Sequence, residues 1–158
     1  MESLSIGQRT FPAALPSHRF TVVVGDDFEP ASAYAFDQAV ALVTRVPGSQ
    51  LEVVHVVHED TPDADIHRLT AMLRVYIDER CAAHPDQGAR VQVRRGEPVD
   101  VIARVASEVG ADVILVGART RMHVREFLQG SLGARLARSA PCPVLVAEPR
   151  AEDARTTR

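Results

Sequence analysis

The 158-residue chain contains no lysine, and all 18 of its basic residues are arginines. Without a lysine amine, it cannot form the Schiff bases on which pyridoxal phosphate enzymes and imine-type aldolases depend. A Walker A loop uses its lysine to contact phosphates, so P-loop NTPase chemistry is excluded as well. Any anion that the protein binds must therefore be held by arginines, backbone N–H groups, hydroxyls or a metal ion.

Tryptophan is also absent, aromatic residues make up only 4% of the chain, and the formal net charge is -3. This composition argues against a base-stacking surface and against nucleic acid as a partner. The two cysteines, Cys81 and Cys142, lack the spacing of a zinc site and fit a reduced, cytoplasmic protein. No apolar run approaches the roughly 20 residues of a membrane span, so we expect no membrane partner.

Five short apolar segments recur along the chain. Three of them are valine-rich and nearly continuous, which is typical of strands buried on both faces of a parallel sheet. One segment alternates apolar and polar residues instead, which predicts an edge strand over residues 89–94. The five segments are Phe20–Gly25, Leu51–Val57, Ala89–Arg94, Asp112–Gly117 and Pro143–Ala147.

Segments of helical periodicity separate these strands, and one of them begins after Pro98 and ends at Gly110. Alternating strands and helices predict an α/β fold: a single-domain, open, parallel five-stranded sheet with helices on both faces. We expect a flexible N-terminal extension over residues 1–18, one folded domain over 19–148 and a flexible tail over 149–158.

Ligands of such sheets bind beyond the carboxyl ends of the strands. Three segments occupy these ends: Gly25–Asp27, His58–Asp60 and the chain from Gly117 onward. Asp26 and Asp27 have two interpretations. In the first, they bind a Mg²⁺ ion that bridges the phosphates of a ligand. In the second, one carboxylate caps the next helix while the other is solvated. For Asp26 we favour the second interpretation. His58–Asp60 gives no spacing on which a metal site can be predicted.

The segment after Gly117 combines features of an anion site. Gly130-Ser131 opens the last helical stripe, and N–H groups at a helix N-terminus attract phosphate. From spacing alone, an anion site and a solvated loop between a strand and a helix are equally supported. The loop carries a dense cationic cluster of Arg119, Arg121, His123 and Arg125.

The same segment resembles the most specific motif of the universal stress protein family. That motif is a glycine, two residues, a second glycine, nine residues, then glycine followed by serine or threonine. Gly117, Gly130 and Ser131 match it, whereas Thr120 stands at the second glycine. The resemblance extends over Arg19–Glu148. Other typical segments are His55-Val56, Gly96–Pro98, Ala111–Ile114, Ser139–Val146 and Asp27–Ser32, in which Glu29 replaces the first serine of an Asp-x-Ser-x-x-Ser turn.

The resemblance implies a Rossmann-like fold of the adenine nucleotide alpha hydrolase type, with strand order 3-2-1-4-5. It also implies two subfamilies, one that binds ATP through the glycine motif and one that does not. By position, Asp27 would meet the ribose or a Mg²⁺ ion, and the glycine motif would cradle the phosphates. The implied nucleotide-binding residues are Asp27, Gly117, Arg119, Thr120, Gly130, Ser131 and Leu132, with Asp27 also as the metal ligand.

Two departures from the ATP-binding pattern leave both subfamilies open. Thr120 fits badly if its position needs a positive φ, whereas its hydroxyl can replace a backbone contact if it does not. Asp26 stands where ATP-binding members usually have a small apolar residue near the adenine. A carboxylate beside a buried base is costly unless it is paired.

Two further residues are predicted to be structural. We expect His55 to be a hydrogen-bonded core histidine and Cys142 to be a small buried thiol. The last strand, with Val144, Leu145 and Val146, has an apolar edge that pairing with a second copy would cover, which predicts a homodimer. The family resemblance implies the same arrangement.

Three functions follow from these observations. The first is a universal stress-type regulatory protein that binds ATP with Mg²⁺ and hydrolyses it slowly at most. The second is a dimeric stress-response interaction module that binds no nucleotide. The third, an enzyme of the adenine nucleotide hydrolase type, is disfavoured because the sequence offers no clear nucleophile–base pair.

Overall fold

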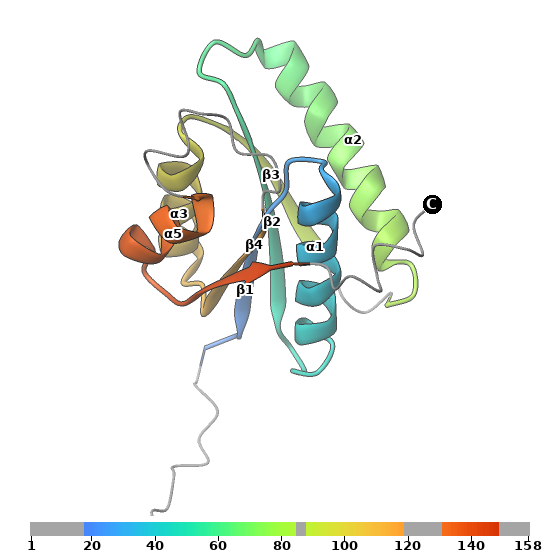
Figure 1. The fold of residues 1–158 in the computed structure, drawn as a ribbon. Coiled ribbons are helices and arrows are strands. Elements are labelled where there is room, and N and C mark those ends of the chain that lie inside the picture. Colours follow the sequence, from blue (N-terminus) through green and yellow to red (C-terminus); the bar gives the residue numbers. More distant parts are fainter. Residues whose placement is uncertain (1–17, 85–87, 119–130, 149–158) are drawn as a thin grey trace, which may run out of the picture.

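The structure is a computed structural model that describes residues 18–84, 88–118 and 131–148 (Figure 1). Within these ranges, five strands alternate with four helices. In chain order, the elements are β1 (Thr21–Gly25), α1 (Pro30–Val43), β2 (Gln50–Val57), α2 (Asp63–Cys81), β3 (Ala89–Arg95), α3 (Pro98–Val109), β4 (Val113–Gly117), α5 (Leu132–Ser139) and β5 (Val144–Ala147).

All five strands are parallel and form one sheet in the order β3-β2-β1-β4-β5, which confirms the predicted fold and strand order. β1 lies in the middle, where Val23 pairs with Glu52 of β2 on one side and with Ile114 of β4 on the other. The chain first winds outward to β3 and then continues on the other side of β1. The strand order therefore reverses between β1 and β4, the point at which such sheets bind ligands.

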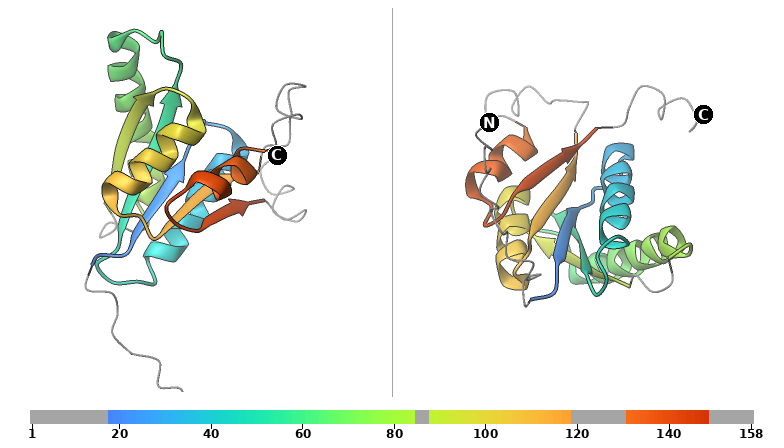
Figure 2. Two further views of the ribbon diagram at one scale, coloured as in Figure 1. Left: turned by 90° about the vertical axis from the view of Figure 1, so that its left-hand side faces the viewer. Right: turned by 90° about the horizontal axis from the view of Figure 1, so that it is seen from below.

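Helices cover both faces of the sheet, α1 and α2 on one face and α3 and α5 on the other (Figure 2). Successive residues of a strand point to opposite faces, so β1 contributes to both cores. Val22 and Val24 pack with Phe36 of α1, whereas Val23 packs with Ile102 of α3. The continuous valine-rich runs of the sequence are explained by this two-sided burial.

Proline and glycine mark the bounds of several helices. Pro30 and Pro98 occupy the first turns of α1 and α3, where a missing N–H costs no helical hydrogen bond. Gly110 follows α3 in the left-handed conformation with φ 62°, as is common after a helix. None of the helices in the described ranges is long and apolar enough to cross a membrane.

The two edges of the sheet carry different side chains. β3 bears three arginines, Arg90, Arg94 and Arg95, and charged side chains discourage pairing of an exposed edge with another chain. β5 instead exposes Leu145 and Val146, which are 50% and 51% accessible. The apolar edge is thus on the side of the sheet that the sequence predicts for dimerisation.

Candidate functional site

A cavity of about 650 Å³ opens at the carboxyl ends of β1, β2 and β4, beside the point where the strand order reverses. One side of the cavity is apolar and is built by β2, α3 and the first residue of α5. The other side is polar and is built by the turn after β1 and the start of α1. The apolar residues include Val54, Val56, Pro98, Ile102 and Leu132, and the acidic ones are Asp26, Asp27 and Glu29.

The cavity brings together three of the predicted nucleotide-binding residues, Asp27, Gly117 and Leu132. They come from the turn after β1, the end of β4 and the start of α5. Ser131 directly precedes Leu132 and begins α5. The other predicted residues of this segment lie outside the described residues; they are Arg119, Thr120, Arg121, His123, Arg125 and Gly130.

Gly117 ends β4 at a place where no side chain fits. A β-carbon built on it would collide with the carbonyl group of Ala31 and lie 2.6 Å from the backbone nitrogen of Ser32. The start of α1 approaches the end of β4 this closely because residue 117 is a glycine. This packing places the first turn of α1 at the cavity, so Gly117 shapes the site through its contact with α1.

Asp27 is held by hydrogen bonds within the turn that precedes α1. Its N–H donates to Ser32 Oγ at 3.3 Å, and its Oδ1 accepts from the Glu29 N–H at 3.1 Å. Ser32 is buried, and its hydroxyl donates to the Glu29 carbonyl at 2.9 Å. The turn therefore presents the Asp27 carboxylate at the polar end of the cavity, where ribose hydroxyls and hard cations are suitable partners.

Asp26 is buried, so the interpretation of this residue as a solvated carboxylate or a helix cap is wrong. Its exposed fraction is 3%, and its Oδ1 accepts from the Phe28 N–H at 2.8 Å. The cap position of α1 belongs to Glu29, and no side chain caps the helix there. Burial raises the pKa of Asp26. The carboxylate stabilises its own turn instead, as Asp residues often do.

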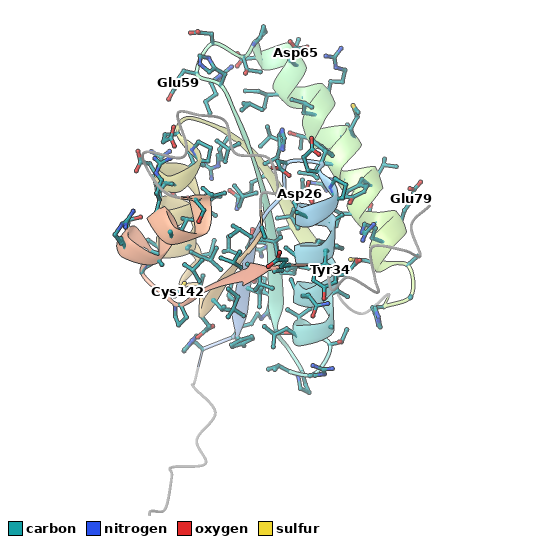
Figure 3. The ribbon with its side chains drawn as sticks, in the orientation of Figure 1. Asp26, Tyr34, Glu59, Asp65, Glu79 and Cys142 are labelled. Carbon is teal, nitrogen blue, oxygen red and sulfur yellow. The ribbon has the colours of Figure 1, made fainter. Side chains whose placement is uncertain are left out.

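The Asp26 carboxylate belongs to the α1–α2 side of the sheet, although the residue also lines the cavity (Figure 3). Val22 and Val24 pack on that side, and residue 26 continues their alternation along β1. Burial raises the pKa of Tyr76 in α2; the Arg80 charge opposes this effect, and the Asp26 charge adds to it.

Phe28 adopts a backbone conformation that is rare for an aromatic residue. It is the single non-glycine residue with a positive φ, 63°, in the part of the chain that the structure describes. Its ring lies 4.7 Å from that of His55 and 6.1 Å from that of Tyr76. His55 Nδ1 forms a hydrogen bond of 2.8 Å with the Asp26 carbonyl, which confirms the predicted hydrogen bond, but the residue is half-buried and less enclosed than a core histidine.

Ser131 is the N-cap of α5, and its Oγ accepts from the Ala134 N–H at 3.3 Å. The hydroxyl hydrogen is not used by this bond and can donate to an anion. Gly133, in the first turn, allows α5 to pack closely on β5, because a β-carbon there would collide with Val146. The capped helix α5 begins at Leu132, which lines the cavity.

Sequence reasoning missed Val54, Val56 and Ile102 on the apolar side of the cavity, and an ion pair between the two helices that begin there. Val54 and Val56 are alternate residues of β2 and face α3, so strand periodicity was the available signal. The ion pair joins Arg135 Nη2 of α5 to Glu97 Oε1, which precedes α3, at 2.9 Å. No sequence signal relates these two residues, because they are far apart in the chain and meet through the packing of the two helices.

The remaining candidates do not form a further site. His58 and Asp60 pair at 3.4 Å on the surface, and within residues 18–84, 88–118 and 131–148 no three or more His, Cys, Asp or Glu side chains are arranged so that they could hold a metal ion. Cys142 is half-buried against the α3–α5 core, less enclosed than predicted, and burial raises the pKa of its thiol. A raised pKa makes a thiol less reactive.

Comparisons with known proteins assign the family. The family model described as the universal stress protein family matches residues 19–148. A universal stress protein of Synechocystis sp. is 32% identical over 115 residues, which cover 69% of this chain and 73% of the relative. One of Mycobacterium tuberculosis is 30% identical over 141 residues, which cover 80% of this chain and 94% of the relative.

A solved structure shares the architecture as well. A universal stress protein in complex with cAMP is 26% identical, with a TM-score of 0.66, and the match covers 81% of this chain and 96% of that chain. The family model spans most of the sequence, and both relatives reach 30% identity over more than two thirds of it. The chain therefore belongs to the universal stress protein family.

Proposed function

We propose that this chain is a stress-response regulatory protein of the cytoplasm that binds ATP, assisted by Mg²⁺, in the cavity at the carboxyl end of the sheet. The observation that carries the proposal is the two-part lining: an apolar wall on one side and the Asp27 carboxylate on the other. A nucleotide has the matching two parts, a flat base and a polar ribose phosphate. The cavity volume of about 650 Å³ lies in the range of small-molecule sites.

The apolar wall suits an adenine ring. Val54 and Val56 project from β2, and Ile102 projects from α3 toward the same core. Burial of a flat ring against these side chains is favourable because it removes apolar surface from water on both partners. Gly25 leaves room at the base of this wall, since a β-carbon there would lie 3.0 Å from Ile102 Cδ1.

The polar end suits a ribose and a hydrated magnesium ion. Mg²⁺ is commonly bound by one or two carboxylates together with substrate phosphates, and both Asp27 and Glu29 line this end. A bound ion would offset the repulsion between these carboxylates and the phosphates. Ser131 and the predicted glycine motif, Gly117 and Gly130 with Thr120, Arg119 and Leu132, would complete the phosphate site.

The similarity to the universal stress protein in complex with cAMP supports an adenine nucleotide as the ligand class. We expect little or no hydrolysis. The lining residues that the structure describes include no histidine or cysteine, so the general bases that they supply are weakly basic carboxylates.

Isothermal titration with Mg-ATP tests the proposal. The wild-type chain should bind, and Asp27→Asn should weaken binding by about tenfold or more, since it removes a charge-assisted contact. Asp60→Asn is the matched control because Asp60 is a surface carboxylate, 92% exposed, at the end of β2 and outside the cavity lining. No heat and no thermal stabilisation at millimolar Mg-ATP would refute the proposal.

A second candidate function is a dimeric interaction module that binds no nucleotide. It is favoured by β5, whose exposed Leu145 and Val146 form the edge that a second copy would cover. Homodimerisation through β5 is compatible with both functions, so the nucleotide titration distinguishes them.

A further inference from the structure

The cavity is acidic where a nucleotide would bring more negative charge. Its described lining contains the carboxylates of Asp27 and Glu29, together with Asp26, whose carboxylate lies on the α1–α2 side, and no arginine or histidine. Since the chain has no lysine, a cationic side chain that meets a phosphate must be an arginine. Among the described residues, Arg135 of α5 follows the cavity-lining Leu132 by one helical turn.

Arg135 and Glu97 link the two helices that begin at the cavity. Glu97 directly precedes Pro98, the first residue of α3, and Arg135 lies one turn after Leu132, the first residue of α5. Both Pro98 and Leu132 line the cavity. Side chains on a helix lean toward its N-terminus, so the Arg135 side chain extends toward the end of α5 that faces the cavity.

The ion pair between Arg135 and Glu97 is weak enough for a ligand to replace Glu97 as the partner of the arginine. The Arg135 and Glu97 side chains are 29% and 51% exposed, and their atoms are 2.9 Å apart. Partly solvated pairs of this type contribute little to stability. Arginine binds phosphate through two parallel hydrogen bonds, which are stronger than a single contact with a carboxylate. A phosphate at the start of α5 can therefore compete with Glu97 for the guanidinium.

We propose that Arg135 is the phosphate-selecting residue of the cavity, held by Glu97 when no anion is bound and transferred to a ligand phosphate when a nucleotide binds. The inference rests on the proposed nucleotide site and names the part of the ligand that Arg135 recognises. Glu97 is then a competitor that weakens phosphate binding. The more phosphates a ligand carries, the more its affinity for the site should change when Arg135 or Glu97 is substituted.

Titration with adenosine, AMP and Mg-ATP tests this role in Arg135→Gln, Glu97→Gln and the wild type. Arg135→Gln should lower the affinity for Mg-ATP about tenfold, the loss of one charge-assisted contact, and leave that for adenosine unchanged. Glu97→Gln should raise the affinity for Mg-ATP a few-fold, because it releases the guanidinium. The double variant should resemble Arg135→Gln.

Arg138→Gln is the matched control, since Arg138 lies on the same helix, is exposed and is one turn further from the cavity. It should leave all three affinities unchanged. Equal losses for adenosine and Mg-ATP in Arg135→Gln would show a merely structural role and overturn the inference. So would an equal loss of Mg-ATP affinity in Arg138→Gln, or a loss in Glu97→Gln.

Tripolyphosphate alone separates this inference from the proposed function. If the wild type binds neither adenosine nor nucleotide, the proposed function fails. Stabilisation by tripolyphosphate that disappears in Arg135→Gln and persists in Arg138→Gln would then still support Arg135 as a phosphate contact. No stabilisation of the wild type by tripolyphosphate or Mg-ATP would overturn both.

Discussion

Gly117 at the end of β4 lies directly against the backbone of Ala31 at the start of α1, with no space for a β-carbon between them. The contact joins the sheet to the helix whose first turn lines the cavity. A glycine that the family motif assigns to phosphate binding is thus also required by packing. Its loss would disturb both the fold and the site.

Gly117→Ala should lower the free energy of unfolding by about 1–3 kcal/mol, because the new methyl group must displace helix backbone. Gly88→Ala is the control, since nothing lies within 4 Å of a β-carbon there and its φ is not positive. The control should stay within about 0.5 kcal/mol of the wild type. Urea denaturation measures both, and equal stabilities would contradict the close contact.

Asp26 stabilises its turn through one oxygen and carries a buried charge at the same time. Asp26→Asn keeps an acceptor for the Phe28 N–H and removes the charge, whereas Asp26→Ala removes both. We expect Asp26→Ala to be less stable than Asp26→Asn by about 1 kcal/mol at neutral pH. We also expect Asp26→Asn to be at least as stable as the wild type, because burial disfavours the ionised form. Thermal and urea unfolding at neutral pH measure these stabilities, and equal stabilities of Asp26→Ala and Asp26→Asn would contradict the role of the hydrogen bond.

Asp112 should contribute stability that disappears in acid. Burial raises the pKa of this carboxyl, but hydrogen bonds from the Thr21 N–H and His18, each 2.8 Å long, bring it below its ordinary value of 3.8. A carboxyl whose pKa is lower in the folded state than in the unfolded state stabilises the fold at pH values above its unfolded-state pKa. This stabilisation is lost as the pH falls through the folded-state pKa. The stability advantage of the wild type over Asp112→Asn should therefore shrink below pH 3.8. An advantage that is the same at about pH 5 and pH 3 in urea titrations would count against this account.

The exposed edge of β5 should mediate homodimerisation. We expect a dimer at micromolar concentration for the wild type, and a monomer for Leu145→Lys, because a charge would be buried in the paired edge. Met72→Lys is the control, since Met72 is 55% exposed on α2, away from β5. Analytical ultracentrifugation measures the oligomeric state. A strictly monomeric wild type, or a monomeric Met72→Lys variant, would exclude this interface.

Much of the fold could be predicted from the sequence because two-sided burial leaves a direct trace. Continuous valine-rich runs indicate central parallel strands, and the alternation in residues 89–94 indicates the edge strand β3. The positions of Pro30, Pro98 and Gly110 at helix bounds follow equally from local backbone preferences.

The site was predictable only where local patterns carry it. Asp27, Gly117 and Leu132 belong to sequence motifs, and they meet at the cavity because β1 and β4 end, and α5 begins, at the same edge of the sheet. The burial of Asp26 was not predictable, since the residue after a strand either leaves the sheet or continues its alternation, and sequence does not distinguish the two. The Arg135–Glu97 pair depends on how α3 and α5 pack, which no local pattern encodes.

A crystal structure of the protein with Mg-ATP tests the central claim most directly. We predict a nucleotide in the cavity, with its base against Val54, Val56 and Ile102 and with its ribose or metal at Asp27. An empty cavity in crystals grown with millimolar Mg-ATP would contradict the account, as would a nucleotide bound elsewhere on the chain.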